Sequence, residues 1–202
     1  MLLTPNKYSR PQIKLNRVAK IAVHYVGNPK SSAKNNRDYF ENLKNTRERY
    51  VSAHFIIGLE GEIIQCIPLD EWSYCTNQAN GYSISIECCH PDSTGKFNSM
   101  TEDSLTELCA YLCRKFGLTA DDIIRHYDVT GKRCPLWYVD HPEDFAAFRK
   151  RVEALISGDA KTVGREMYYV QVGAFASKEN AEKYLEKVKN DYPSAFIKVM
   201  KQ

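Results

Sequence analysis

The sequence lacks any long hydrophobic run. No stretch of its 202 residues approaches the roughly 20 consecutive apolar residues that a bilayer-spanning helix needs. Residues 1–7 also lack the apolar core of about 7–15 residues that secretory signals carry. We therefore expect no membrane insertion and no signal peptide. The prediction is a protein made in the cytoplasm that stays there at first.

Compact metal and disulfide signatures are missing as well. The chain has no HExxH segment and no paired CxxC motif, and its seven cysteines are an odd number. Without an export signal, such a set predicts reduced thiols rather than a disulfide framework. A hydrophobic content of 43% and a charged content of 26% are typical of a globular protein, not of a disordered one.

Charge is unevenly distributed along the chain, although the net charge is only +3. Residues 1–50 hold 11 Lys and Arg against 3 Asp and Glu, whereas residues 51–160 hold 9 against 17. The basic residues of 1–50 could bind an anionic polymer. Alternatively, they form a solvated surface whose charge is balanced by the acidic residues of 51–160. Because no basic cluster carries interleaved aromatic residues, we predict no nucleic-acid partner.

The pattern of apolar residues predicts a two-part chain. Two glycines and few apolar residues mark a linker at 158–166, between a main domain, 1–157, and a small module, 167–202. In the main domain, strands are expected at 19–25, 54–59, 62–67 and 82–88, helices at 37–48, 99–116 and 142–157, and a loop at 126–135. Ser99 and Glu102 match a capping box at the start of the second helix. This alternation predicts an α/β fold with a central mixed β-sheet flanked by helices.

The segment from His126 to Cys134 is the strongest local candidate for chemistry. It places an imidazole and a thiol eight residues apart on a loop that Gly131 can fold tightly. Both groups bind zinc, and a catalytic zinc site needs three protein ligands and one open position. His24, at the end of a buried strand, is a plausible third ligand. The alternative is an ordinary loop histidine and a buried cysteine.

Four separated motifs then resemble a known family. In chain order they are Ala22–Tyr25, Ser52–Ile57, Tyr82–Glu87 and the pair His126–Asp128 with Lys132–Pro135. Together they resemble the zinc-dependent N-acetylmuramoyl-L-alanine amidases of the type-2 amidase and peptidoglycan-recognition-protein family, which includes phage lysozyme-type amidases. The resemblance covers about residues 15–155 and implies the fold of that family.

The resemblance also implies a site. His24, His126 and Cys134 match the family's ligands for one Zn²⁺ per chain, which leaves the other six cysteines as core or incidental thiols. Lys132 matches a lysine that stabilises the oxyanion, and Glu87 matches a carboxylate that acts as general base and proton donor in some branches. The alternatives are a solvated loop lysine and an exposed strand glutamate.

Some positions depart from the family pattern. Ala53 stands where other branches have a tyrosine, which moves the acid–base role towards Glu87. Ser73 follows Trp72 where many relatives have a histidine. Trp72 is expected either to border the substrate groove or to pack in the core, and Tyr50 is a candidate cleft residue. The neighbouring His54 is expected to be structural or to support the site from outside.

The implied reaction is hydrolysis of the amide between N-acetylmuramic acid and L-alanine in peptidoglycan. A phage or prophage endolysin, cytoplasmic until lysis and then active at the cell wall, is the preferred hypothesis. The alternatives are a non-catalytic peptidoglycan-binding protein, a bacterial autolytic or sporulation amidase, and a zinc-stabilised structural protein.

The sequence pattern of the C-terminal module predicts a β-α-β unit. Strands are expected at 168–175 and 195–200, with a helix after Ser177 between them. The unit resembles the first repeat of a SPOR peptidoglycan-binding domain, which normally holds two repeats. One hypothesis is that two chains pair their half-modules and form a homodimer. The other is a lone unit docked on its own catalytic domain, and both imply wall targeting.

Overall fold

The computed structural model describes residues 1–158 and 177–191. Contacts between Cα atoms divide the chain into two compact units, Met1–Lys161 and Thr162–Gln202, which are described separately. No helix in the described residues is long and apolar enough to cross a membrane.

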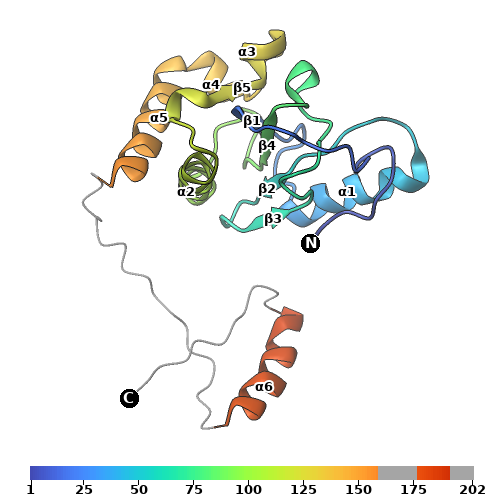
Figure 1. Cartoon of the computed structure of the whole chain (residues 1–202). Helices are drawn as coiled ribbons and strands as arrows, with labels where there is room; N and C mark the ends of the chain where they lie inside the picture. The colour runs from blue at the N-terminus through green and yellow to red at the C-terminus, as the bar shows by residue number, and fades with distance from the viewer. Residues whose placement is uncertain (159–176, 192–202) are drawn as a thin grey trace. The chain divides into compact units, whose positions relative to one another are not determined.

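A five-stranded mixed sheet forms the centre of the first unit (Figure 1). Its order is β3 (Ile63–Gln65), β2 (Phe55–Ile57), β4 (Ser83–Cys88), β1 (Lys20–Tyr25) and β5 (Ile123–Arg125). β3 is antiparallel to β2, and the other neighbouring pairs are parallel. The predicted mixed sheet is confirmed.

Helices cover both faces of this sheet. The long helices are α1 (Ala33–Thr46), α2 (Ser99–Phe116) and α5 (Pro142–Ser157); the short elements are η1 (Asn77–Ala79), η2 (Ala120–Asp122), α3 (His126–Thr130) and α4 (Leu136–Asp140). Successive residues of β2 show the two layers. Phe55 and Ile57 pack with α2 and α5, whereas Ile56 packs in a second cluster with α1.

Three local expectations need correction. The predicted loop at 126–135 begins with the one-turn helix α3. Asn98, not Ser99, caps α2, because its side-chain oxygen accepts the Thr101 N–H at 2.9 Å. The first helix starts at Ala33, four residues before the predicted start, because Ser32 caps it with its own hydroxyl.

Alternate side chains of β4 point to opposite faces of the sheet, apolar on one face and polar on the other. Ile84, Ile86 and Cys88 join the core beneath α2, as their spacing predicts. On the opposite side, Ser83 and Ser85 are buried beneath the segment 73–80, which includes η1. The loop therefore covers the polar face of β4 at these two serines, whereas Glu87, further along the same face, is only partly buried.

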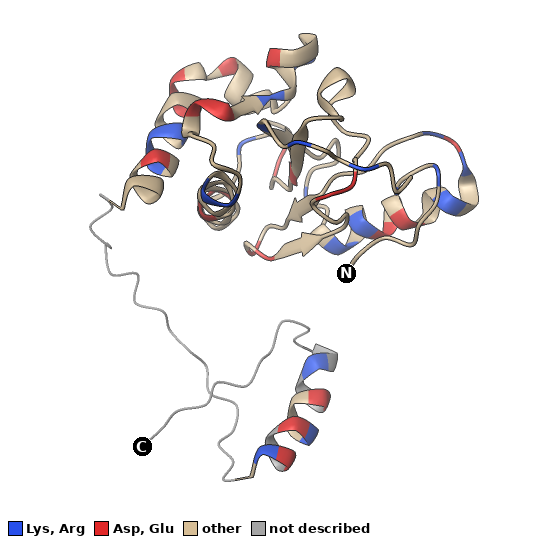
Figure 2. Ribbon diagram, viewed as in Figure 1, with Lys and Arg blue, Asp and Glu red and all other residues tan. Residues whose placement is uncertain are grey.

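Several basic side chains of the N-terminal third form ion pairs with acids. Arg37 and Lys44 on α1 both contact Glu41, and Figure 2 shows that both signs of charge alternate along this helix. Arg10 binds Glu71, and Lys20 binds Asp122, both in the acidic middle of the sequence. For these side chains the balanced surface is the correct interpretation.

In the second unit, the structure describes the helix α6 (Lys178–Asp191), where a helix was predicted. The strands expected at 168–175 and 195–200 lie outside the described residues. The pairing of two chains through this module depends on the same strands and lies outside them too.

Candidate metal centre

Three polar side chains meet where parallel strands end. His24 on β1 is the register partner of Glu87 on β4. His126 directly follows β5, the other neighbour of β1. Ligand sites of α/β sheets form at the carboxyl ends of parallel strands, and this edge brings together side chains from three of them.

Cys134 reaches the same edge because the chain turns back after α3. Gly131 ends that helix in the left-handed conformation, with φ of 78°, which favours a residue without a side chain. The segment that follows this turn is held in place because the Tyr127 N–H donates a hydrogen bond to the Cys134 carbonyl at 3.1 Å. Cys134 Sγ then lies 3.7 Å from His24 Nδ1.

These residues fit a zinc ion. One donor atom each from His24, His126 and Cys134 lies within 4.8 Å of the other two, and all three side chains are buried. In the described part of the chain, His126 Nδ1 is one of two buried side-chain atoms without a hydrogen-bond partner, although such atoms are normally paired. Two imidazoles and one thiolate would supply three protein ligands, the number that catalytic zinc sites have.

Electrostatics keep both imidazoles neutral, as metal ligands must be. Burial lowers the pKa of His24 well below its ordinary value, and the neighbouring His126 and Lys132 lower it further. Burial and Lys132 lower the pKa of His126 in the same way. Neutral rings keep a lone pair available for a cation.

Glu87 lies beside this cluster and is partly buried. Burial raises the pKa of its carboxyl to about 7, although Cys75 and Lys132 oppose the shift. The Cys75 thiol lies 3.6 Å from Glu87 Oε1, while Oε2 is the second buried atom without a partner. The carboxyl group is thus held at one oxygen and left unpaired at the other.

Lys132 is exposed on the loop between the two loop ligands. Its backbone N–H donates to Thr130 Oγ1 at 3.3 Å. Burial raises the pKa of the Cys134 thiol to about 12, and the Lys132 ammonium opposes this rise as it opposes the rise at Glu87. The charge therefore acts on the centre from the solvent side.

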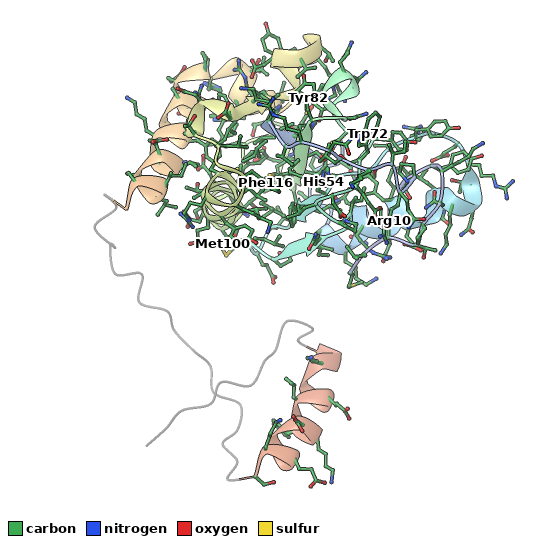
Figure 3. All side chains as sticks on the ribbon, in the orientation of Figure 1. Arg10, His54, Trp72, Tyr82, Met100 and Phe116 are labelled. Atoms are coloured by element: carbon green, nitrogen blue, oxygen red, sulfur yellow. The ribbon has the colours of Figure 1, made fainter. Side chains whose placement is uncertain are left out.

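The two candidate substrate-binding residues differ in their environment. Trp72 is partly buried and packs against the core cluster (Figure 3). Tyr50 is 55% exposed, stacks on Tyr8 at 5.2 Å between ring centroids, and meets the edge of Tyr74 at 5.5 Å. Neither residue belongs to the group of ligand atoms.

Sequence reasoning missed Cys75 and Thr76. All seven cysteines are free, and the five buried ones other than Cys134 are ordinary core thiols, but Cys75 contacts Glu87. Thr76 Oγ1 lies 2.9 Å from His24 Nε2. The only available signal was the nearness of Cys75 to the expected groove residue Trp72, because the segment has no periodicity.

His54 has the structural role that was expected for it. Its Nδ1 accepts the backbone N–H of Ser85 at 3.0 Å, and its Nε2–H donates to the Glu71 carbonyl at 2.9 Å. The hydroxyl groups of Ser85 and Ser73 form a hydrogen bond of 2.6 Å, which completes a buried polar network beneath β4. Figure 3 labels His54 in the interior of the domain.

Two family descriptions match the sequence. Residues 14–137 match the family described as N-acetylmuramoyl-L-alanine amidase, and residues 164–202 match the SPOR domain. The chain is 38% identical over 174 residues to the N-acetylmuramoyl-L-alanine amidase BlyA of Bacillus subtilis, and 36% identical over 173 residues to CwlL of Bacillus licheniformis. The matches cover 76% and 79% of the chain but 46% and 47% of these relatives, so the chain spans about half their length.

Solved structures share the fold. PlyL superposes with a TM-score of 0.65 at 23% identity, covering 76% of this chain and 94% of that one. The catalytic domain of XlyA superposes with a TM-score of 0.61 at 23% identity, covering 74% and 99%. The predicted α/β architecture is thereby confirmed.

Proposed function

The chain belongs to the N-acetylmuramoyl-L-alanine amidase family, and from that premise we propose that it hydrolyses the amide bond between N-acetylmuramic acid and L-alanine in peptidoglycan. The observation that carries the proposal is the convergence of His24, His126 and Cys134 at one sheet edge, beside the partly buried Glu87. The family membership indicates the substrate, and the geometry of the site indicates which residues would bind the metal and move protons.

One zinc ion would be held by the two imidazoles and the thiolate. When bound, it supplies a Lewis acid for the scissile carbonyl and lowers the pKa of a water molecule. The remaining chemistry belongs to side chains of this chain, because moving protons and stabilising charge on the substrate require groups next to the metal.

Glu87 is the proton carrier of the proposed mechanism. With a pKa of about 7, its carboxyl is present in both protonation states at neutral pH. It therefore accepts a proton from the attacking water and returns it to the departing amine of L-alanine. Cys75 fixes one carboxyl oxygen, so that Oε2 is the oxygen directed at the reacting groups.

Lys132 stabilises the negative charge that develops on the carbonyl oxygen. Its ammonium already influences four groups of the centre electrostatically, and its exposed position on the loop gives it access to a substrate outside the fold. A positioned cation is most effective where charge appears only in the transition state.

We assign substrate contact to Tyr50 rather than to Trp72. The Tyr50 ring is exposed and backed by two further tyrosines, which is suitable for stacking on a sugar or peptide, whereas the indole is used in core packing. The SPOR match at 164–202 supports a second contact with the wall, through the C-terminal module.

An endolysin role is the biological setting we propose. It draws on the likeness in fold to a protein described as a mutant endolysin from Bacillus subtilis. Peptidoglycan is the partner in this setting, and the cell wall is the place of action.

The test is hydrolysis of purified sacculi by the full chain, with release of new N-terminal alanine as the readout. We expect release that stops when a chelator removes the metal and returns when zinc is restored. Cys134→Ser should remain folded but inactive. Binding to sacculi without any release under zinc-replete conditions would instead indicate a non-catalytic peptidoglycan-binding protein.

A further inference from the structure

Thr76 contacts His24 on the side that faces away from Cys134. Thr76 Oγ1 lies 2.9 Å from His24 Nε2, while His24 Nδ1 lies 3.7 Å from Cys134 Sγ. Thr76 is completely buried, and His24 is 1% exposed. Each ring nitrogen of His24 therefore has one defined neighbour, a hydroxyl for Nε2 and a thiol for Nδ1.

This arrangement has a consequence for the proton on the ring. A neutral imidazole carries a single N–H, and a metal can bind only the other nitrogen. We propose that Thr76 is a positioning residue whose hydroxyl oxygen accepts the Nε2–H of His24, so that the Nδ1 lone pair points at the metal beside Cys134. Such outer partners fix the tautomer and the orientation of a metal-binding histidine.

Thr76 is itself held rigidly. Asn80 Oδ1 accepts the backbone N–H of Thr76 at 2.7 Å and that of Cys75 at 3.1 Å. The Ala79 N–H donates to the Thr76 carbonyl at 3.0 Å, which closes the turn from the other side. A hydroxyl on this turn has little freedom to follow a moving ring, so the ring must settle against it.

The same hydrogen bond favours one of two ligand sets. His24 lies within 4.8 Å of the donor atoms of His126 and Cys134, and also within 4.8 Å of those of Cys75 and Glu87. Thr76 occupies Nε2 and leaves Nδ1, the nitrogen beside Cys134. A metal bound at Nδ1 would lie beside Cys134, a member of the first set.

The inference rests on the proposed metal site, and its test measures metal binding by the full chain without peptidoglycan. Thr76→Val keeps the shape of the side chain but removes the acceptor. We expect its zinc affinity, measured by competition with a chromophoric chelator, to fall about 10- to 100-fold. Thr76→Ser restores the hydroxyl and should bind zinc with nearly the affinity of the wild type.

Thr101→Val is the matched control. Thr101 is also completely buried, and its hydroxyl donates to the Gly58 carbonyl at 2.8 Å, at the start of α2 and away from the metal centre. This variant loses a buried hydrogen bond but should retain wild-type zinc affinity. The absorption of bound cobalt(II) should change in Thr76→Val and stay unchanged in Thr101→Val. Only Thr76→Val removes the hydrogen-bond partner of a proposed metal ligand, His24.

Equal zinc affinity in the wild type and Thr76→Val would overturn the role of Thr76 alone. A wild-type chain that binds no zinc would overturn the metal site together with this inference. If Thr76→Val fails to fold, the nitrogen NMR signals of His24 in the wild type decide. A proton on Nε2 supports the proposal, and a proton on Nδ1 overturns it.

Discussion

His24 and Glu87 face each other across the parallel strands β1 and β4, as register partners at the carboxyl end of the sheet. Neighbouring strands are held about 4.8 Å apart by backbone hydrogen bonds. The spacing of the backbone between a proposed metal ligand and the proposed proton carrier is thus set by the sheet itself, and the segment 126–134 brings the other two ligands to them.

Glu87→Gln should abolish proton transfer and leave the metal site intact. General acid–base catalysis contributes about 10²- to 10⁴-fold, so we expect kcat for peptidoglycan hydrolysis to fall by that factor. Zinc affinity of the full chain should remain near that of the wild type. Unchanged kcat would remove Glu87 from the mechanism.

Lys132→Met should slow hydrolysis because the developing oxyanion loses its cation. Removal of one such stabilising group costs about 10²- to 10³-fold in kcat. Lys150→Met, at an exposed position of α5, changes the net charge by the same amount and should leave kcat unaltered. Equal rates for the two variants would mark Lys132 as an ordinary solvated lysine.

Tyr50→Ala should weaken substrate binding without changing the chemical step. Loss of one stacking surface is worth about 0.5–1.5 kcal/mol, which corresponds to a rise in KM of roughly 2- to 12-fold. Tyr111→Ala is the matched control, because Tyr111 on α2 is 50% exposed and Tyr50 is 55% exposed. A fall in kcat with constant KM would contradict the binding role.

Stability should decrease in mild acid because of His54. Burial lowers the pKa of this imidazole from 6.5 in the unfolded chain to about 4, only partly opposed by its hydrogen bond to the Glu71 carbonyl and by the Glu71 charge. Between these pH values, His54 is protonated in the unfolded chain but not in the folded one. Stability is therefore retained above pH 6.5 and lost as pH falls towards 4. Between pH 7.5 and 5, this group alone should cost about 2 kcal/mol.

Urea unfolding of the wild type and of His54→Gln at both pH values checks this expectation. The variant lacks the titrating ring, so its stability should change less between the two conditions. An identical pH dependence in both proteins would show that other groups control the acid response.

Arg10→Ala should destabilise the fold by about 1.5–3 kcal/mol. Arg10 binds both carboxylate oxygens of Glu71 at 2.7 and 2.8 Å and also the Leu3 carbonyl, with both charged side chains mostly buried. Lys34→Ala removes an ion pair whose lysine is 70% exposed, and should change the unfolding free energy by at most about 0.5 kcal/mol. Chemical denaturation of both variants measures the contrast.

The sequence was informative where periodicity or family pattern applied. The alternation of Ile84, Ile86 and Cys88 predicted β4 and its buried face, because side chains of a strand point alternately to opposite sides. The grouping of His24 with His126 and Cys134 was likewise expected, because the family resemblance implied it. Their roles in catalysis stay predictions.

Other features had no local signal. The contact of Thr76 with His24 joins residues 52 positions apart, and nothing in a segment without periodicity indicates such a partner. The cap of α2 was misplaced by one residue, because Asn98 and Ser99 are both good capping residues. A helix as short as α3 has too few turns to produce an apolar period.

The separation of the ligands along the chain has a consequence for synthesis. His24 leaves the ribosome 110 residues before Cys134, and β5, which aligns His126, follows most of the sheet. A nascent chain that ends before residue 134 holds no complete ligand set. The proposed ligand set is therefore completed only after all five strands of the sheet have been synthesised.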